Sequence, residues 1–471
     1  MRTRTRNGLA GLLIAAAIGV AGCGGGGGGG AEGCIGVPVP KAAIFKSCPR
    51  PPAGGLGKIK HIVIIMQENR SFDSYFGTFP GADGIPMVGG APSVCVPDPV
   101  THKCVYPYHD PNDVNSDQPH HHCAAIEDTN GGKMNGFLSS SEGYKRQVCT
   151  NSSKPCPITP LEAMGYHDDR EIPLYWTYAQ DFVLQDHMFE SITSWSWPAH
   201  LFMVSEWSAS CANGDPFECL NAIAGPAYSV PSIIPRLAWT DLTYLLHKSG
   251  VTWGYYVSNG TEPDCDDDDD SSKCVQGALN SQTPGIWNPL PLFDTVKEDG
   301  ELQNVQDVSE FYTAALSGTL PAVSWIVPSW EVSEHPPYSI KVGQAYVKGL
   351  IDAVMTGPDW SSSAIFLSWD DWGGFYDHEP PPGVDGNGFG LRVPGLVISP
   401  YAKQGFIDHQ VLSPDAYVKF IEDVFLNGQR LDPKTDGRGD SRPDVRENSC
   451  DLGDLANDFD FSQPARAAGS H

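Results

Sequence analysis

The sequence predicts a three-layer α/β sandwich with a mostly parallel central sheet, and three observations support this. Short, almost continuous apolar runs lie along the chain, which is typical of strands buried on both faces of a sheet: His61–Met66, Val251–Val257, Val323–Val327, Ala364–Leu367 and Val393–Ile398. Stretches expected to be helical alternate with them: Leu174–Phe182, Asp241–Lys248, Gly343–Met355 and Asp415–Phe425. With 471 residues, 40% of them hydrophobic, the chain can bury a large core.

The charge balance excludes one class of partner. Against 57 acidic residues stand 30 basic ones, which gives a formal net charge of -27. Such a chain repels phosphate backbones, so we expect no nucleic acid partner. Nothing in the sequence predicts a protein partner either.

The N-terminus predicts export. Three arginines precede the apolar run Leu9–Val20, which is too short to span a bilayer, so residues 1–22 are interpreted as a signal peptide. The segment Val20-Ala21-Gly22-Cys23 resembles the lipobox of bacterial lipoproteins, which implies a lipidated Cys23 and a membrane anchor facing the periplasm or the cell surface. The alternative is simple secretion. Residues 23–56 would be a glycine-rich tether, 57–430 the catalytic domain, and 431–471 an extension that docks on this domain or trails from it.

The cysteines also indicate an oxidising compartment. The chain has 13 of them, and a lipidated Cys23 would leave an even number for disulfides. Insertions at about residues 87–160 and 208–280 contain close pairs that are candidates for local bridges: Cys95/Cys104, Cys149/Cys156, Cys211/Cys219 and Cys265/Cys274.

Acidic side chains follow two of the apolar runs. Glu68 and Asn69 come directly after the first predicted strand, and Asp370 and Asp371 come shortly after the fourth. The carboxyl ends of parallel strands meet at one edge of a sheet, and carboxylate and amide oxygens are ligands for hard divalent cations. Taken singly, either group could instead be a hydrogen-bonded loop.

Six segments in order resemble the successive signatures of the bacterial phosphoesterase family, which contains non-specific phospholipases C and a class of acid phosphatases. They are HIVIIMQENRSFDSYFG, NGGKMNGF, SWSWPAHLFMVS, VSWIVPSWEVSEHPPYS, DDWGGFYDHEPPP and RVPGLVISPYAKQGFIDH. The resemblance runs from about residue 58 to 427. It implies an alkaline-phosphatase-like fold, metal-assisted hydrolysis of phosphate esters and an extracytoplasmic location.

Carried over residue by residue, the resemblance makes Glu68, Asn69, Asp370 and Asp371 ligands of a divalent metal ion, whether zinc, calcium, manganese or magnesium. The nucleophile, aligned on Pro198, is Ser196. Relatives usually have Gly-Pro where this chain has Ser194-Trp195, and Asn where it has Ala199, so Ser194 and Thr193 remain alternatives.

The resemblance also assigns the polar residues around the metal. It makes His120 and His335 catalytic, either to protonate the leaving alkoxide or to bind a phosphoryl oxygen. A one-residue slip would put His121 or His122 in place of His120. His378 and Lys133 are candidate substrate-binding residues, with structural roles as the alternative.

The predicted chemistry is attack of a serine hydroxyl on phosphorus, followed by hydrolysis of the phosphoserine. A metal ion would lower the pKa of the hydroxyl and supply the positive charge that this acidic chain lacks. The leading hypothesis is a phospholipase C acting on phospholipid phosphate esters; an acid phosphatase and a catalytically inactive surface-binding lipoprotein are the alternatives. Four tryptophans would form either a cage for a choline ammonium or part of the core: Trp195, Trp197, Trp369 and Trp372.

Overall fold

The computed structural model describes residues 54–149, 155–228, 234–262, 277–443 and 445–469. All of them belong to one of the two compact units of the chain, the one that spans Val39–His471. The predicted signal peptide, nearly all of the predicted tether and the Cys265/Cys274 pair lie outside the described residues, so these stay predictions. Among the helices of the described part, none is long and apolar enough to cross a membrane.

An eight-stranded sheet forms the centre of this unit, in the order β14-β11-β15-β1-β16-β17-β8-β18. Every neighbouring pair is parallel except the two that involve β17, so seven of its strands run in one direction. The prediction of a mostly parallel sheet is therefore confirmed. In sequence order the strands are β1 (His61–Gln67), β8 (Val183–Gln185), β11 (Trp253–Val257), β14 (Val305–Asp307), β15 (Val323–Val327), β16 (Ser363–Trp369), β17 (Gly395–Ile398) and β18 (Phe406–Asp408).

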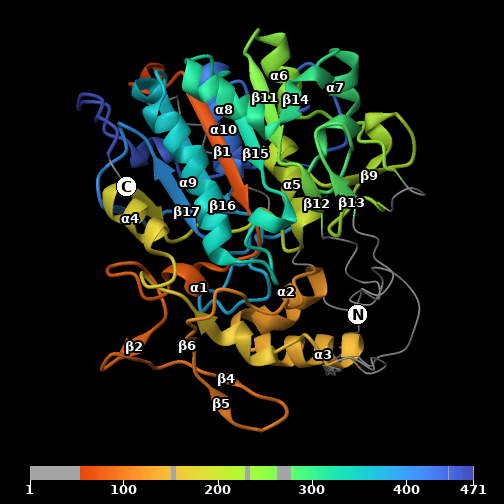
Figure 1. The fold of residues 1–471 in the computed structure, drawn as a ribbon. Coiled ribbons are helices and arrows are strands. Elements are labelled where there is room, and N and C mark those ends of the chain that lie inside the picture. The colour runs from red at the N-terminus through yellow and green to blue at the C-terminus, as the bar shows by residue number, and fades with distance from the viewer. Residues whose placement is uncertain (1–53, 150–154, 229–233, 263–276, 444, 470–471) are drawn as a thin grey trace, which may run out of the picture. The chain divides into compact units, whose positions relative to one another are not determined.

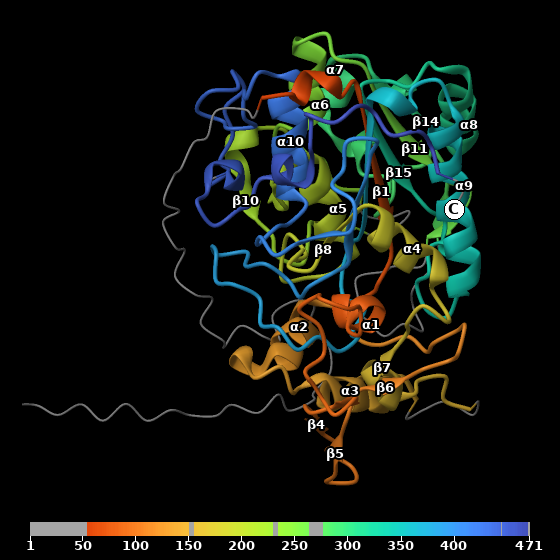
Figure 2. The same cartoon turned by 90° about the vertical axis from the view of Figure 1, so that its left-hand side faces the viewer.

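Helices cover both faces of the sheet. Figure 2 shows α5, α6 and α10 on one side of the strands and α4, α8 and α9 on the other. This is the predicted α/β sandwich. The helices are α1 (Phe72–Phe76), α2 (His122–Thr129), α3 (Phe137–Cys149), α4 (Pro173–Asp181), α5 (Ser196–Ser205), α6 (Leu242–Lys248), α7 (Asp294–Glu298), α8 (Val308–Ser317), α9 (Ile340–Thr356) and α10 (Asp415–Phe425).

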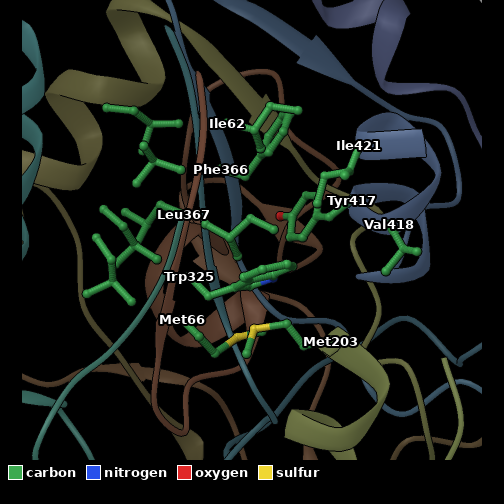
Figure 3. Close-up of a cluster of buried hydrophobic side chains, with 14 of the residues drawn as sticks. Ile62, Met66, Met203, Trp325, Phe366, Leu367, Tyr417, Val418 and Ile421 are labelled. Carbon is green, nitrogen blue, oxygen red and sulfur yellow. The ribbon is translucent and has the colours of Figure 1, made fainter. Parts of the chain in front are cut away.

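The core forms where apolar helix faces meet the central strands. Tyr417 and Ile421 lie one turn apart on α10 and point toward β16, where the Phe366 ring stacks on Tyr417 at 4.9 Å between centroids (Figure 3). Met203 of α5 reaches the same cluster beside Met66 of β1. Strands β1 and β16 are buried along almost their whole length, so apolar side chains are needed on both of their faces. This explains why both strands appear in the sequence as nearly continuous apolar runs.

The structure corrects one strand. The run at Val393–Ile398 forms β17 only from Gly395, and this strand lies antiparallel to both β16 and β8. Strand direction depends on how the chain returns to the sheet. An apolar run looks the same in either direction, so this difference is not visible in the local pattern.

The two insertions carry small two-stranded sheets and local disulfides. Three of the predicted pairs are bonded, Cys95–Cys104, Cys149–Cys156 and Cys211–Cys219. Helices α2 and α3 of the first insertion lie below the sheet in Figure 1, at the edge where β1 ends. The small sheets pair β2 (Met87–Val88) with β3 (Ala91–Pro92), β4 (Val96–Pro97) with β5 (Cys104–Val105), β6 (Tyr108–His109) with β7 (Gly165–Tyr166), β9 (Ala209–Cys211) with β10 (Cys219–Asn221), and β12 (Gly260–Glu262) with β13 (Gly277–Leu279).

The C-terminal residues pack on the sandwich. The Phe459 ring stacks on Phe420 of α10 at 5.2 Å, and its backbone forms a bridge to Ala402. Farther upstream, the buried Arg446 guanidinium makes two 2.8 Å hydrogen bonds to Asp385 and one of 3.3 Å to Asp415. Arg446 therefore ties this segment to two different loops of the body.

We expect Arg446→Met to lower the free energy of unfolding by about 3–5 kcal/mol, because Asp415 would remain buried without its cation. Chemical denaturation of the purified wild-type and variant proteins measures the free energy of unfolding. Arg438→Met is the control: Arg438 pairs with the exposed Glu298 at 2.6 Å, and its loss should cost less than about 1 kcal/mol. Equal losses for the two variants would contradict the role given to Arg446.

Candidate active site

The carboxyl ends of β1 and β16 bring the four predicted metal ligands together. These parallel strands pair in register as far as Gln67 and Trp369, so Glu68-Asn69 and Asp370-Asp371 leave the sheet side by side. The Asn69 backbone N–H donates to Asp370 Oδ1 at 3.1 Å. All four side chains are buried.

Ser196 faces this cluster from the first turn of α5. Its Oγ lies 3.4 Å from Glu68 Oε2 and 3.3 Å from Asp371 Oδ2. Pro198 suits the first turn, where a backbone N–H has no partner within the helix. Of the alternatives, the Thr193 hydroxyl donates to the Phe389 carbonyl at 2.9 Å, and the buried Ser194 hydroxyl has no hydrogen-bond partner in the described part of the chain.

The Asn69 amide connects the carboxylates to two histidines. In the orientation that satisfies both of its ends, its nitrogen lies 3.3 Å from Glu68 Oε2 and 3.3 Å from Asp370 Oδ1. Its oxygen then accepts from His120 Nε2 at 3.1 Å and from His335 Nε2 at 3.2 Å. The structure thus places both predicted catalytic histidines on the side of Asn69 away from the acids.

Backbone carbonyls hold the two rings in place. His120 Nδ1 lies 2.8 Å from the Gln118 carbonyl, and His335 Nδ1 lies 2.6 Å from the Pro336 carbonyl. Each ring therefore has an oxygen atom within hydrogen-bond distance of both nitrogens, which fixes its orientation. The neighbouring His121 and His122 serve elsewhere, since His121 caps α2 and His122 contacts the Thr193 carbonyl at 2.5 Å.

Behind His335, the carboxyl group of Glu334 anchors the loop that follows β15. It accepts hydrogen bonds from the hydroxyls of Tyr75, at 2.6 Å, and Tyr175, while Arg70 donates to the Glu334 carbonyl at 2.8 Å. Burial raises the pKa of Glu334 to about 7, against the hydrogen bonds from the two tyrosines. Because Arg70 follows Asn69, this contact joins the two loops that carry the site.

A Gly-Gly turn allows the loop after β16 to approach closely. Gly373 has φ +63°, and a Cβ there would lie 2.5 Å from the Asn69 carbonyl oxygen. Its N–H donates to Asp371 Oδ1 at 2.7 Å. At Gly374, φ +71°, a Cβ would lie 2.6 Å from the Pro119 oxygen, directly before His120. Both glycines are therefore required by this geometry.

Comparison with known proteins identifies the family of the chain. The profile of the Phosphoesterase family matches residues 59–426. The chain belongs to the phosphoesterase family. It is accordingly a hydrolase that acts on phosphoester bonds.

Several curated relatives are phospholipases C. Phospholipase C B of Mycobacterium tuberculosis is 26% identical over 466 residues, covering 88% of this chain and 80% of its own length. The non-hemolytic phospholipase C of Pseudomonas aeruginosa is 27% identical over 471 residues, covering 87% of this chain and 58% of its own. Non-specific phospholipase C1 of Arabidopsis thaliana is 25% identical over 405 residues, covering 77% of this chain and 65% of its own length.

Among solved structures, a protein of the alkaline phosphatase superfamily from Vibrio parahaemolyticus aligns with a TM-score of 0.36 and 13% identity. It covers 85% of this chain and 74% of that one.

The site of this phosphoesterase fits a divalent cation. Asp370 Oδ2 is buried and has no hydrogen-bond partner among the described residues, which is costly for a carboxylate unless a cation faces it. Glu68, His200 and Asp370 each offer a ligand atom within 4.8 Å of the others. This mixture of oxygen and imidazole donors suits several divalent metals.

Two further predicted residues lie apart from the cluster. The His378 ring contacts Asp73, Asp83 and Arg392. Although burial alone would lower its pKa, the hydrogen bond to Asp73 and nearby acidic charges raise the pKa of His378 to about 9. Lys133 is exposed in the turn after α2. Their predicted substrate-binding roles stay predictions.

The four tryptophans near the site are core residues. Trp195, Trp197, Trp369 and Trp372 are each at most 3% exposed. The indole N–H of Trp195 donates to the Ala224 carbonyl, and that of Trp372 donates to Asp128. The alternative of an open aromatic cage made by these residues is therefore wrong.

Two residues of the site were not predicted. His200 lies one turn after Ser196 on the same face of α5, and its Nε2 is 3.0 Å from Glu68 Oε1. The i, i+4 spacing was the signal that could have found it. Glu190 is fully buried, and burial, then the charges of Asp371 and Asp370, raise its pKa well above the usual range. A carboxyl in a loop carries no comparable sequence signal.

We expect Gly373→Ala to lower kcat/KM for a chromogenic phosphoester at least tenfold, because the added Cβ would displace Asn69 and a left-handed conformation costs alanine about 1–2 kcal/mol. Gly383→Ala, in the same loop, is the control, since nothing lies within 4 Å of its Cβ position. Unchanged kinetics in folded Gly373→Ala protein would refute this role of the turn.

Stability should depend on pH through Glu334. In the folded chain its pKa is about 7, against 4.5 for the ordinary side chain, so between these values the folded state binds more protons than the unfolded one. The free energy of unfolding should therefore fall as pH rises from 4.5 to 7, by up to about 3 kcal/mol. Glu334→Gln lacks this titration. Its stability relative to wild type, measured by denaturation at pH 5 and pH 8, should improve at the higher pH; a constant difference would contradict the assignment.

Proposed function

We propose that this phosphoesterase is a phospholipase C-type phosphodiesterase with Ser196 as its nucleophile. The observation that carries the proposal is the position of Ser196 Oγ, at the N-terminus of α5 and within 3.4 Å of carboxylate oxygens from both strand ends. The phospholipase C names of the M. tuberculosis and Arabidopsis relatives support the choice of a phosphodiester substrate.

The reaction begins when Ser196 Oγ attacks phosphorus and its proton passes to Glu68 or Asp371, the two carboxylates it faces. The N-terminus of α5 carries partial positive charge, which favours the phosphoryl oxygens beside Ser196. A divalent cation held by Glu68, Asn69, Asp370 and Asp371, with His200 beside them, would lower the pKa of the Ser196 hydroxyl and neutralise phosphoryl charge.

The bond between phosphorus and the diacylglycerol oxygen then breaks. His120 or His335 donates a proton from Nε2 to this alkoxide, which leaves as an alcohol, and the phosphorylated head group stays on Ser196. Water then attacks the phosphoserine, with the same histidine as base. The bond between phosphorus and Ser196 Oγ breaks, Oγ recovers the proton held by Glu68 or Asp371, and the phosphorylated head group is released.

Rates of the metal-loaded protein with p-nitrophenylphosphorylcholine and p-nitrophenyl phosphate test the proposal. We expect the diester to be preferred and Ser196→Ala to lose at least about a thousandfold in kcat. Ser194→Ala, the neighbouring buried serine, is the matched control and should stay within a few-fold of wild type. Removal of metal by a chelator should abolish activity, and added metal should restore it.

Each other outcome contradicts a distinct part of the proposal. A preference for the monoester would identify an acid phosphatase with the same machinery. Loss of activity in Ser194→Ala but not in Ser196→Ala would identify Ser194 as the nucleophile. Equal background rates for wild type and Ser196→Ala would indicate that the protein is a catalytically inactive surface-binding protein.

A further inference from the structure

A second group of side chains with metal-ligand atoms lies at the carboxyl-terminal edge of the sheet and shares no residue with the active site. His187 follows β8, and His378 and Glu379 lie in the loop after β16. Asp83 joins them from the segment after α1. Because β8 and β16 run in the same direction, their following loops emerge at one edge.

The donor atoms of this group are spaced for a metal ion. Asp83, His378 and Glu379 each offer a ligand atom within 4.8 Å of the others. His378 Nε2 lies 3.6 Å from Asp83 Oδ1, and His187 Nε2 lies 2.9 Å from Asp83 Oδ2. Neighbouring ligands of a four-coordinate zinc ion with bonds of about 2.0–2.1 Å are about 3.3 Å apart, so these spacings lie on either side of that value.

A buried carboxylate orients the His378 ring toward this group. Asp73, which is 1% exposed, accepts from His378 Nδ1 at 2.8 Å and from the His378 backbone N–H at 2.9 Å. Arg392 holds Asp73 in turn, at 3.2 Å. A carboxylate on one ring nitrogen leaves the other directed at the metal, which is the usual arrangement around metal-bound histidines.

Asp83 is fixed in position yet open to solvent. Its N–H donates to Asp186 Oδ2 at 2.8 Å and its carbonyl accepts from Arg392 at 2.7 Å, while its side chain is 46% exposed.

We propose that Asp83, His378 and Glu379, with His187 beside Asp83, bind a divalent transition metal ion of the zinc type, at a second site separate from the catalytic cluster. Zinc accepts this combination of imidazole and carboxylate donors.

Titration of tag-free, metal-stripped full-length protein with Co²⁺ tests this, with the visible absorption band of the bound ion and calorimetric stoichiometry as readouts. To isolate the second site, the titration uses an Asp370→Asn background, which disables the catalytic cluster. This protein should bind one ion, and adding Asp83→Asn or Glu379→Gln should raise Kd at least tenfold.

His409→Gln in the same background is the matched control. Its Nδ1 contacts Asp186 at 2.8 Å and its ring lies 6.4 Å from that of His187, so it borders the site without facing Asp83. Its Kd should be unchanged, and melting temperatures confirm that each variant is folded. Failure of Asp370→Asn protein to bind Co²⁺, or binding that neither Asp83→Asn nor Glu379→Gln weakens, would overturn the proposal. So would equal weakening by His409→Gln.

Discussion

The parallel pairing of β1 with β16 is the constraint on which the active site depends. Their register ends at Gln67 opposite Trp369, so the polar segments after both strands begin at the same level. A slip of one residue would move one pair of ligands by about 3.3 Å and break the hydrogen bond from Asn69 to Asp370. Strand β15, on the other side of β1, delivers the His335 loop to the same edge.

Electrostatics sets the second requirement. Glu68, Asp370, Asp371 and Glu190 are buried close together in a chain with a net charge of -27. Repulsion between carboxylates in a water-poor environment is costly unless some are neutralised. Burial and the neighbouring charges of Asp371 and Asp370 raise the pKa of Glu190, which shows how unfavourable another negative charge is at this place. The N-terminus of α5 lies beside these acids, and a divalent cation held by them would supply further positive charge.

Buried ionic contacts outside the cluster hold the loops that carry it. Arg392 pairs with Asp73 and Asp377, which joins the segment after β1 to the loop after β16. Glu334 does the same for the loop after β15 through Tyr75 and Arg70. Loops have little core of their own, so polar contacts with directional geometry position their side chains more closely than apolar packing does.

The amino-acid sequence by itself determined five of the eight central strands, several helices and the chemical types at the strand ends. The three-residue strands β8, β14 and β18 are too short to form a distinct apolar run. Buried parallel strands are continuous apolar runs, and the acids at Glu68 and Asp370 stand out directly after them. Predicted helices agree within a few residues because α9 and α10 present one apolar face. Only the tertiary structure shows that β17 runs in the reverse direction. It also shows that Ser196, rather than Ser194 or Thr193, faces the carboxylates. His200 and Glu190 join the site only through the fold. These depend on which distant segments meet at one edge of the sheet, and local periodicity carries no record of long-range pairing.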